Sequence, residues 1–469
     1  MLIALMSLEV GLQALAICGT VLLWARPQLL DWTGVAANIG RALILSLSCT
    51  LSFYFTELYD LRKVRSFEQF SARLPKSLGV SLILTAVFYM LLPELRLTKG
   101  PFTSSLLVLV GVMVPLRGAL YAIMQARASR EQVLIVGTSP LGWKIVAEME
   151  AAPHLGYSVM GFVDDGESSP LEPSPHELYP LLGPPEDLWK TIEELRPDRV
   201  VVAVGERPGR LSLPQLLKTK WSGIVVEEGT EIYERLAKKL PIESLTPSRI
   251  IASRDFGKLG WLTAAQRALS LTVAALGLLL TWPLMGIIAW LIKLDSKGPV
   301  FFIQKRMGRR ERVFRLIKFR TMHPTSNETT EWVRDNNNRI TRIGKWLRKS
   351  RLDELPQFVN ILLGDMNLVG PRPHPVSNLE LFVEKIPYYS LRHMVRPGIT
   401  GWAQVRYGYA NNLDEETEKT RYDLYYIKHL SLWFDLRILF ETVRVVLFRP
   451  GSKEAFALRA PNLAGASRR

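Results

Sequence analysis

Two adjacent carboxylates, Asp353 and Glu354, directly follow the most basic stretch of the chain. Between Lys297 and Arg351 there are 16 lysine and arginine residues but only 4 acidic ones. Adjacent carboxylates supply hard oxygen ligands for Mg²⁺, which usually binds through one or two carboxylates together with substrate phosphates. The stretch therefore indicates chemistry on an anionic substrate, and anionic lipid headgroups and a diphosphate are both open as its partners.

A stiff turn, Gly370-Pro371-Arg372-Pro373, comes soon after the pair and presents one arginine, whose fork suits phosphate oxygens. Between pair and turn, residues 356–363 are typical of a short helix with proline in its first turn and Gly364 at its end. An acid near a helix N-terminus is most often only a cap that interacts with the helix dipole. Capping and catalysis both remain open for the pair.

The composition limits the class of protein. The chain has 469 residues, 48% of them apolar, and a formal net charge of +15, which indicates more than one domain and a phosphate-rich partner. A nucleic-acid partner would require a recognisable binding motif, and the sequence contains none. The two cysteines, Cys18 and Cys49, both lie in apolar runs, which excludes a disulfide framework and a cysteine metal site.

Four apolar runs in the first 130 residues predict a bundle of four transmembrane helices over residues 1–127. These runs are 2–25, 35–54, 78–92 and 104–123. The first run lacks the basic start of a signal peptide, so a retained helix is the better interpretation. The charged residues inside the runs, Glu9, Arg41 and Arg117, are interpreted as packing or snorkelling groups rather than as a functional site.

The basic residues of the loops predict the orientation of this bundle. Lysine and arginine concentrate after the second and fourth runs and are sparse in the other two loops. By the positive-inside rule, both ends of the bundle face the cytoplasm. The chain that follows is therefore expected to begin on the cytoplasmic side.

A fifth apolar run, residues 269–292, carries basic residues on both sides and Trp282-Pro283 near its middle. Proline removes a backbone donor and clashes with the preceding turn, so a helix should kink or break at this place. The pattern favours a re-entrant helix over residues 267–293 that dips into one leaflet. A fifth spanning helix with a tolerated proline is the alternative.

The middle of the chain, residues 128–250, is predicted to be a Rossmann-like parallel α/β domain. Strands are expected at 133–136, 158–163, 199–204 and 223–226, alternating with helical stretches. A glycine-containing turn follows the first strand, and Asp164-Asp165 stand where a ribose-binding acid would lie. The central glycine of the dinucleotide fingerprint is missing, so a nucleotide site and a purely structural or regulatory domain both remain open.

Five motifs in the last part of the chain carry a family resemblance. They are Lys318-Phe319-Arg320-Thr321-Met322, Leu352-Asp353-Glu354-Leu355-Pro356-Gln357, Gly364-Asp365-Met366, Val369-Gly370-Pro371-Arg372-Pro373 and the run from Arg396 to Gln404. In this order they resemble the bacterial sugar transferases, the monotopic polyprenyl-phosphate phosphoglycosyl transferases. The preceding bundle and α/β domain resemble the large members of that family. The resemblance places a mainly helical catalytic domain at 266–450, after a linker at 251–265 and before a flexible tail at 451–469.

The resemblance implies transfer of a sugar 1-phosphate from a nucleoside diphosphate sugar, usually a UDP-sugar, to undecaprenyl phosphate, with release of UMP. This would be the first membrane step of exopolysaccharide, capsule or O-antigen synthesis at the bacterial inner membrane, with the catalytic domain on the cytoplasmic face. Membrane lipid is a further expected partner, nucleic acid is not, and a homodimer is left open.

The resemblance also implies a role for each site residue. Asp353 would be the nucleophile, and it would hold Mg²⁺ together with Glu354. Cations would stabilise phosphate charge. These are Lys318, Arg348 and Arg372, with Arg320 and Arg396 as weaker candidates, for which a role in supporting the fold alone is also open. Many members of the family have serine before the kink proline, where this chain has Trp282, which puts a hydroxyl-assisted kink in doubt but not the kink at Pro283.

Two other classes of function are less consistent with the sequence. A membrane scaffold that senses nucleotide sugars would not need Asp353, Glu354 and Arg372 together. A sugar-nucleotide dehydratase or epimerase would need the missing glycine and a Tyr-x-x-x-Lys pair, which the middle domain lacks. The sugar is not identified, because loops such as residues 323–338 would read its hydroxyls.

Overall fold

The computed structural model describes residues 2–24, 32–56, 58–59, 64, 67–97, 99–126, 131–164, 179–204, 212–252, 260–323, 339–408 and 410–448. Asp165, most of the expected sugar-reading loop and the tail from residue 451 onward lie outside these ranges. Among the described residues the structure contains the helical membrane-like segments, the α/β sheet and the helical C-terminal region that the sequence predicts.

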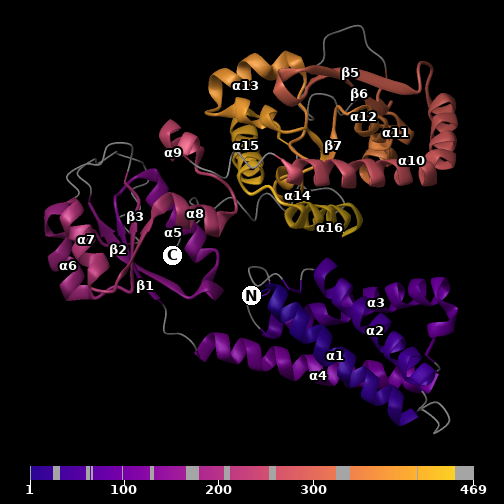
Figure 1. Cartoon of the computed structure of the whole chain (residues 1–469), viewed down its shortest axis with the longest axis horizontal. Helices are drawn as coiled ribbons and strands as arrows, with labels where there is room; N and C mark the ends of the chain where they lie inside the picture. The colour runs from indigo at the N-terminus through magenta and orange to yellow at the C-terminus, as the bar shows by residue number, and fades with distance from the viewer. Residues whose placement is uncertain are drawn as a thin grey trace. The chain divides into compact units, whose positions relative to one another are not determined.

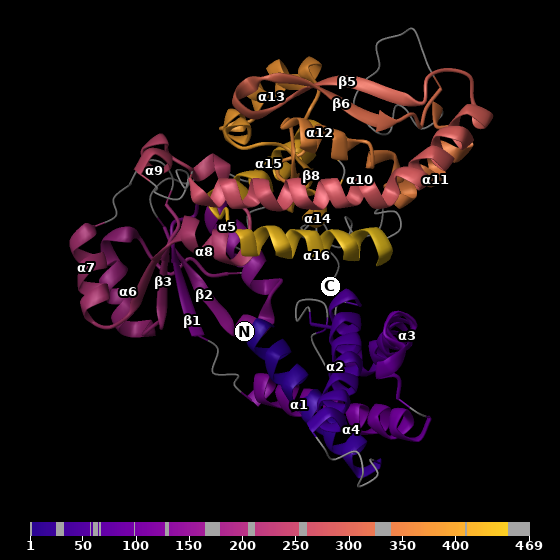
Figure 2. The same ribbon diagram turned by 45° about the vertical axis from the view of Figure 1, so that its right-hand side comes forward.

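Four helices form the first region, and they pack side by side in both views (Figure 1 and Figure 2). Their bounds are α1 Leu2–Trp24, α2 Trp32–Phe55, α3 Phe67–Leu91 and α4 Lys99–Ala126. Among the described residues, α3, part of α4 and a later helix, α10, are long and apolar enough to cross a membrane, and α2 contains a shorter apolar stretch. The four predicted helices are thus present, whereas a four-span crossing remains a prediction.

A buried ion pair joins two helices of this bundle. Arg117 Nε of α4 lies 2.8 Å from Glu9 Oε1 of α1, and neither side chain is exposed. The Arg117 guanidinium also lies 4.9 Å from the centre of the Tyr59 ring. A charge buried among apolar helices is tolerated when it is paired. These contacts confirm the interpretation of Glu9 and Arg117 as packing groups of the bundle.

The middle region contains a four-stranded sheet in the order β2-β1-β3-β4, in which β3 and β4 are parallel. The strands are β1 Glu131–Val136, β2 Tyr157–Val163, β3 Arg199–Val202 and β4 Val225–Glu228. The helices are α5 Pro140–Glu150, α6 Leu188–Leu195, α7 Leu213–Trp221 and α8 Gly229–Ala237. All four strands lie where the alternation of apolar segments predicts them, within a few residues.

The glycine that follows β1 has a structural explanation. Gly137 has φ +108°, and a Cβ at this position would lie 2.5 Å from the carbonyl oxygen of Ala203 after β3. Only glycine fits such a close approach of two backbones. The packing of β1 against β3 therefore already requires Gly137, without a bound nucleotide.

The C-terminal region is mainly helical, with one antiparallel hairpin of β5 and β6 and one short parallel pair of β7 and β8. Its strands are β5 Phe301–Met307, β6 Val313–Phe319, β7 Asn367–Val369 and β8 Gly398–Thr400. Its helices are α9 Pro247–Ala252, α10 Trp261–Asp295, α11 Arg342–Ser350, α12 Gln357–Leu363, α13 Leu379–Lys385, α14 Trp402–Arg406, α15 Leu413–Lys428 and α16 Leu432–Phe448.

The fifth apolar run forms one helix, α10, which begins at Trp261, ahead of the predicted start at 267, and contains Pro283. The helix is not divided into two, but its ribbon changes direction before its C-terminal end in both views (Figure 1 and Figure 2). A bend is what an interior proline causes, because it removes a hydrogen bond and crowds the preceding turn. Trp282 is exposed, and the re-entrant placement of α10 remains a prediction.

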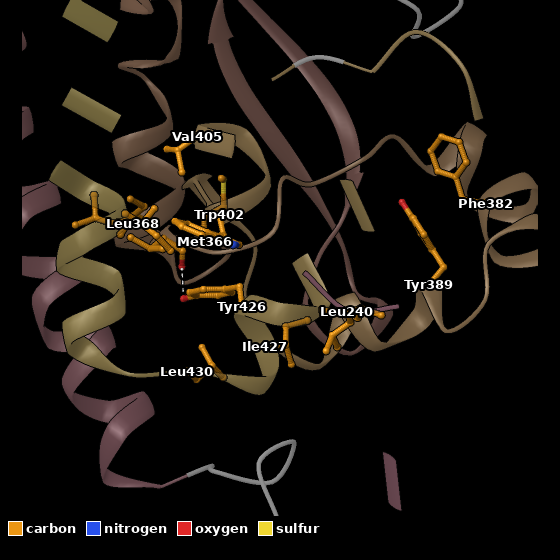
Figure 3. Packing of buried hydrophobic residues seen from close by; sticks show 14 of the residues in the cluster. Leu240, Met366, Leu368, Phe382, Tyr389, Trp402, Val405, Tyr426, Ile427 and Leu430 are labelled. Carbon is orange, nitrogen blue, oxygen red and sulfur yellow. Dashed lines mark hydrogen bonds between the residues drawn. The ribbon is translucent and has the colours of Figure 1, made fainter. Parts of the chain in front are cut away.

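The core of the C-terminal region extends into the segment that precedes α9. Leu240 and Ile242 are fully buried in the same cluster as Trp402, Tyr426 and Ile427 (Figure 3). We call residues 238–245 the connecting segment. The predicted domain boundary at residue 250 thus assigns to the α/β domain a segment whose apolar side chains pack in the core of the C-terminal region.

Candidate active site

Asp353 and Glu354 lie on a single 3₁₀ turn, Leu352–Glu354, between α11 and α12. Arg351 ends α11 with φ +59°, which turns the chain and brings both carboxylates into the interior, where each is about 8% exposed. The N-cap of α12 is Pro356, and no side chain caps this helix through a hydrogen bond. The capping alternative is therefore not supported, since both acids lie before the cap position.

Glu354 receives the nearby positive charge. Its Oε1 lies 2.9 Å from Arg372 Nη2, 3.5 Å from Arg351 Nη1 and 3.8 Å from Lys318 Nζ. Burial by itself would raise the pKa of Glu354, but the charges of Arg372, Lys318 and Arg351 lower it to about 2. Glu354 is therefore ionised at neutral pH and holds three cations around one oxygen.

Asp353 has a different environment from its neighbour. Its Oδ1 is buried and accepts no hydrogen bond within the described part of the chain. Burial and the negative charge of Glu354 raise the pKa of Asp353, while Lys318, Arg351 and Arg372 oppose this rise. Asp353 thus keeps an uncommitted carboxylate oxygen beside a cluster of cations, although a buried polar atom normally has a partner.

Lys318 is positioned by the β5–β6 hairpin, in which it pairs with Phe302. Arg306 of β5 lies on the same face of the hairpin, because the two strands alternate their side chains in register. Burial, followed by the charge of Arg372, lowers the pKa of Lys318 to about 7, and Arg306 acts in the same direction. The lysine therefore changes its charge near neutral pH.

The structure brings together four of the residues that the sequence singled out: Asp353, Glu354, Lys318 and Arg372. It adds Arg351, which contacts Glu354 directly. In the sequence, Arg351 stands out only as part of the basic stretch. Its position three residues before Glu354 nevertheless indicates that the two side chains can pair on one helical turn.

Two other predicted phosphate ligands are engaged elsewhere. Arg320 donates hydrogen bonds to the carbonyl oxygens of Ser296 and Lys297, which follow α10. Arg396 donates to the carbonyl oxygen of Gly364, which ends α12. Arginine near a helix C-terminus satisfies carbonyls that have no partner within the helix. These contacts fit a role in supporting the fold, and a phosphate-binding role for Arg320 and Arg396 remains a prediction.

Arg348 contacts one of the predicted motifs but is not among the residues that surround Glu354 through the ion pairs described above. Its Nε donates a hydrogen bond to Thr321 Oγ1, 2.9 Å away, in the motif that begins at Lys318. This contact ties α11 to the residues that follow the hairpin. A phosphate-binding role for Arg348 remains a prediction.

Two family models match parts of this chain. A family model described as "Bacterial sugar transferase" matches residues 261–449, and one described as "CoA-binding domain" matches residues 54–205. The first match contains the whole of the carboxylate site, and the second overlaps α3, α4 and most of the α/β region.

Curated relatives extend the similarity over most of the chain. A UDP-glucose:undecaprenyl-phosphate glucose-1-phosphate transferase of Xanthomonas campestris is 33% identical over 363 residues, 76% of this chain and 74% of the relative. A protein of the same name from Klebsiella pneumoniae is 32% identical over 378 residues, 78% of this chain and 80% of the relative. A UDP-N-acetylgalactosamine-undecaprenyl-phosphate N-acetylgalactosaminephosphotransferase of Aeromonas hydrophila is 47% identical over 189 residues, 40% of this chain and 45% of the relative. Because the Xanthomonas and Klebsiella relatives match at 33% and 32% identity over more than two thirds of each chain, this chain belongs to the bacterial sugar transferase family, as a large form with an N-terminal membrane and α/β region.

Proposed function

We propose that this protein transfers a sugar 1-phosphate from a UDP-sugar to undecaprenyl phosphate and releases UMP. The relatives' names support the substrate classes. The observation that carries the mechanism is the unequal environment of the two carboxylates, because Glu354 is surrounded by cations while Asp353 keeps a free oxygen. The reaction would be the first membrane step in building an exopolysaccharide, a capsule or an O-antigen.

In the proposed mechanism, an oxygen of Asp353 attacks the sugar-bearing phosphorus of the donor. The bond from this phosphorus to the bridging oxygen breaks, and UMP leaves with the bonding electrons. A phosphate oxygen of undecaprenyl phosphate then attacks the same phosphorus, which forms the undecaprenyl diphosphate sugar and restores the Asp353 carboxylate. Two displacements replace one encounter between two anions, and fixed cations stabilise the charge of each transition state.

The cations of the site have distinct roles in this proposal. Arg372 and Arg351 stay charged at all working pH values and orient the diphosphate through their planar forks. Glu354 holds both guanidinium groups on one side of the turn, within 3.5 Å of its Oε1. This arrangement keeps the cations from pairing with Asp353, which leaves its carboxylate available for the attack.

The donor set of the site fits one Mg²⁺ ion. The buried Asp353 carboxylate has an oxygen without a hydrogen-bond donor, the atom type that Mg²⁺ accepts, and Glu354 is adjacent. One Asp353 oxygen would hold the ion together with Glu354, and the other would make the attack. The described residues contain no group of three or more His, Cys, Asp or Glu side chains that could enclose a metal, so substrate phosphates would complete the coordination. When bound, the ion would neutralise charge on the diphosphate.

Metal removal is therefore expected to stop turnover. EDTA added to the purified protein in lipid should abolish UMP release from the UDP-sugar, and an excess of MgCl₂ should restore it. NaCl at equal ionic strength should not restore UMP release, because a monovalent cation does not hold carboxylate and phosphate oxygens in an octahedron. Unchanged UMP release in EDTA would show that the cations of the protein suffice.

The dependence of activity on pH should have two limbs. Asp353 must be ionised to attack, and its raised pKa moves the acid limb above that of an ordinary aspartate. Lys318 loses its charge as the pH rises through about 7, which removes a cation from the site. The ratio kcat/KM reports groups of the free enzyme, so it should fall on the alkaline side of about pH 7. Arginine stays charged, so Lys318→Arg should move the alkaline limb to higher pH in initial-rate measurements, and an unmoved limb would exclude Lys318 as its origin.

We also propose that the catalytic region acts at the cytoplasmic face of the bacterial inner membrane. The cytoplasmic side rests on the positive-inside pattern of the loops. α10 supports contact with the membrane, because large apolar side chains on it are exposed, among them Leu279, Leu280 and Trp290. A soluble protein rarely leaves so many of them on one helix, whereas a helix in contact with lipid does.

The function is tested by a single-turnover experiment without the acceptor. Mixing the enzyme with UDP-glucose or UDP-N-acetylglucosamine should release UMP in an amount equal to the enzyme, and should add one phosphosugar to the protein mass. Adding undecaprenyl phosphate should then convert this burst into steady turnover. UMP release that depends on the acceptor from the start would contradict the covalent step, and no release with any UDP-sugar would contradict the function.

A further inference from the structure

The turn that presents Arg372 is held by an unusual set of hydrogen bonds. Each carbonyl oxygen from Pro371 to His374 accepts a hydrogen bond, two of them from neighbouring residues of β5 and two from the segment 392–398. The donors are, in order, Gly398 N, Arg392 Nη2, Arg306 Nη1 and Met307 N. Because prolines 371 and 373 have no N–H to donate, the carbonyls are the main means of fixing this turn.

Arg392 is the buried member of this set. It is only 4% exposed, and its Nη2 donates to the carbonyl oxygen of Arg372 at 3.2 Å. The same guanidinium donates to Asp423 of α15 through Nε at 2.9 Å and to the Tyr389 hydroxyl through Nη1 at 2.5 Å. All its nitrogens are thus engaged, which fixes the direction of its bond to the turn.

A second layer of charges fixes Arg392 itself. Glu416 of α15 lies 3.7 Å from Arg392 Nη1, 3.1 Å from Lys419 and 3.3 Å from the ring of His374. His374 belongs to the turn, so the network contacts the turn through a backbone carbonyl and through a side chain. Burial, followed by the charge of Arg392, lowers the pKa of His374, so this histidine is neutral at working pH and accepts or donates only as an imidazole.

We propose that Arg392 is a positioning residue for the transfer reaction, which sets the place of Arg372 relative to Glu354 and the donor diphosphate. This inference rests on the proposed function. Arg392 contacts neither carboxylate of the pair in the described structure, so its effect passes through the backbone of Arg372. Misplacing a catalytic group by about 1 Å can cost on the order of 10²-fold in rate.

Lysine cannot replace Arg392 in this role. Its ammonium is a point charge on a flexible stem and cannot bind Asp423, Tyr389 and the Arg372 carbonyl in one plane. Arg392→Lys keeps the charge and removes the geometry, so it separates electrostatics from positioning.

The test is a double-mutant cycle on the full chain in lipid, with kcat for UMP release as the readout. Arg392→Lys alone should lower kcat about 100-fold. In an Arg372→Ala background the same change should lower kcat less than about twofold, because the group that Arg392 positions is gone. An equal loss in both backgrounds would overturn the proposal, since a general structural role does not depend on Arg372.

A second readout does not need turnover. The rate at which phenylglyoxal modifies Arg372, measured by peptide mass spectrometry, should rise in Arg392→Lys because the turn is held less firmly. Asp423→Asn keeps the Arg392 guanidinium but weakens its bond to residue 423, so it should also raise the modification rate of Arg372. This variant replaces Arg392→Lys in the test if the lysine variant does not fold. An unchanged rate would overturn the proposal even if the protein transferred no sugar.

The matched control is Arg421→Lys on α15, the helix that also carries Asp423. Arg421 forms ion pairs with Glu243 and Glu418 rather than with the turn. Its replacement should leave both the modification rate of Arg372 and kcat within about twofold of the wild type. If wild-type protein shows no UMP release, the proposed function fails, whereas normal wild-type turnover with an additive cycle contradicts only the role of Arg392.

Discussion

Asp353→Asn is expected to abolish UMP release from a UDP-sugar, with a loss of roughly 10⁴-fold or more in kcat. Asparagine has nearly the same shape, but its amide oxygen carries no negative charge and does not attack phosphorus. The substitution also removes the mutual repulsion with Glu354, which contributes to the raised pKa of Asp353, so the folded state should not be destabilised. Measuring both the burst in UMP and the mass of the protein after mixing with UDP-sugar separates loss of the covalent step from loss of binding.

The control for this prediction is Asp414→Asn. Asp414 is an exposed acid in the first turn of α15, so its loss should cost only the small interaction with the helix dipole. Its variant should turn over like the wild type. If Asp353→Asn kept wild-type turnover, Asp353 would not be the nucleophile, and its free oxygen would take no part in the reaction.

The second large effect is expected for stability, in the connecting segment. Leu240 and Ile242 are buried in the catalytic core, and replacing a buried Leu or Ile with Ala typically costs about 2 to 5 kcal/mol each. The double variant Leu240→Ala, Ile242→Ala should therefore unfold the C-terminal region at a clearly lower temperature, measured by tryptophan fluorescence in detergent. Trp402 is a suitable reporter because its indole donates a hydrogen bond to the Lys238 carbonyl, 2.9 Å away.

The comparison for this effect is Leu213→Ala. Leu213 begins α7 and is 66% exposed, so its truncation should change the unfolding temperature only slightly. A double variant at positions 240 and 242 that unfolded like the wild type would show that the catalytic core does not depend on the connecting segment. In that case a fragment beginning at α10 should fold alone.

Several features could be predicted because they depend on residues close together in the sequence. The strands of the α/β region follow from runs such as Val133 to Val136, which are apolar and bounded by glycine or proline. The short helix after the carboxylate pair follows from Pro356 and Gly364, which are typical of a helix start and a helix end. Local propensity and periodicity need no knowledge of distant contacts.

Other features depend on contacts between distant segments. Arg320 and Arg396 carry the same charge as Arg372, and the sequence does not distinguish a guanidinium that holds a helix end from one that faces a phosphate. The packing of the connecting segment is a second example, because Leu240 shares a buried cluster with residues nearly 200 positions later, among them Ile427. The pattern of a sequence does not reveal which of several apolar surfaces a short segment covers.

The sequence indicates the class of partner. It supplies two neighbouring acids, a dozen excess positive charges before them and an arginine fixed between two prolines, and these residue types indicate a phosphate-rich partner. The tertiary structure alone decided how the two acids differ. Arg372 and Lys318 approach from the turn after β7 and from β6, and they meet Glu354 rather than Asp353. Asp353 and Glu354 carry the same type of charged group, but adjacent side chains point in different directions. Only the folded surroundings therefore give Glu354 its cation partners and leave Asp353 with a free oxygen.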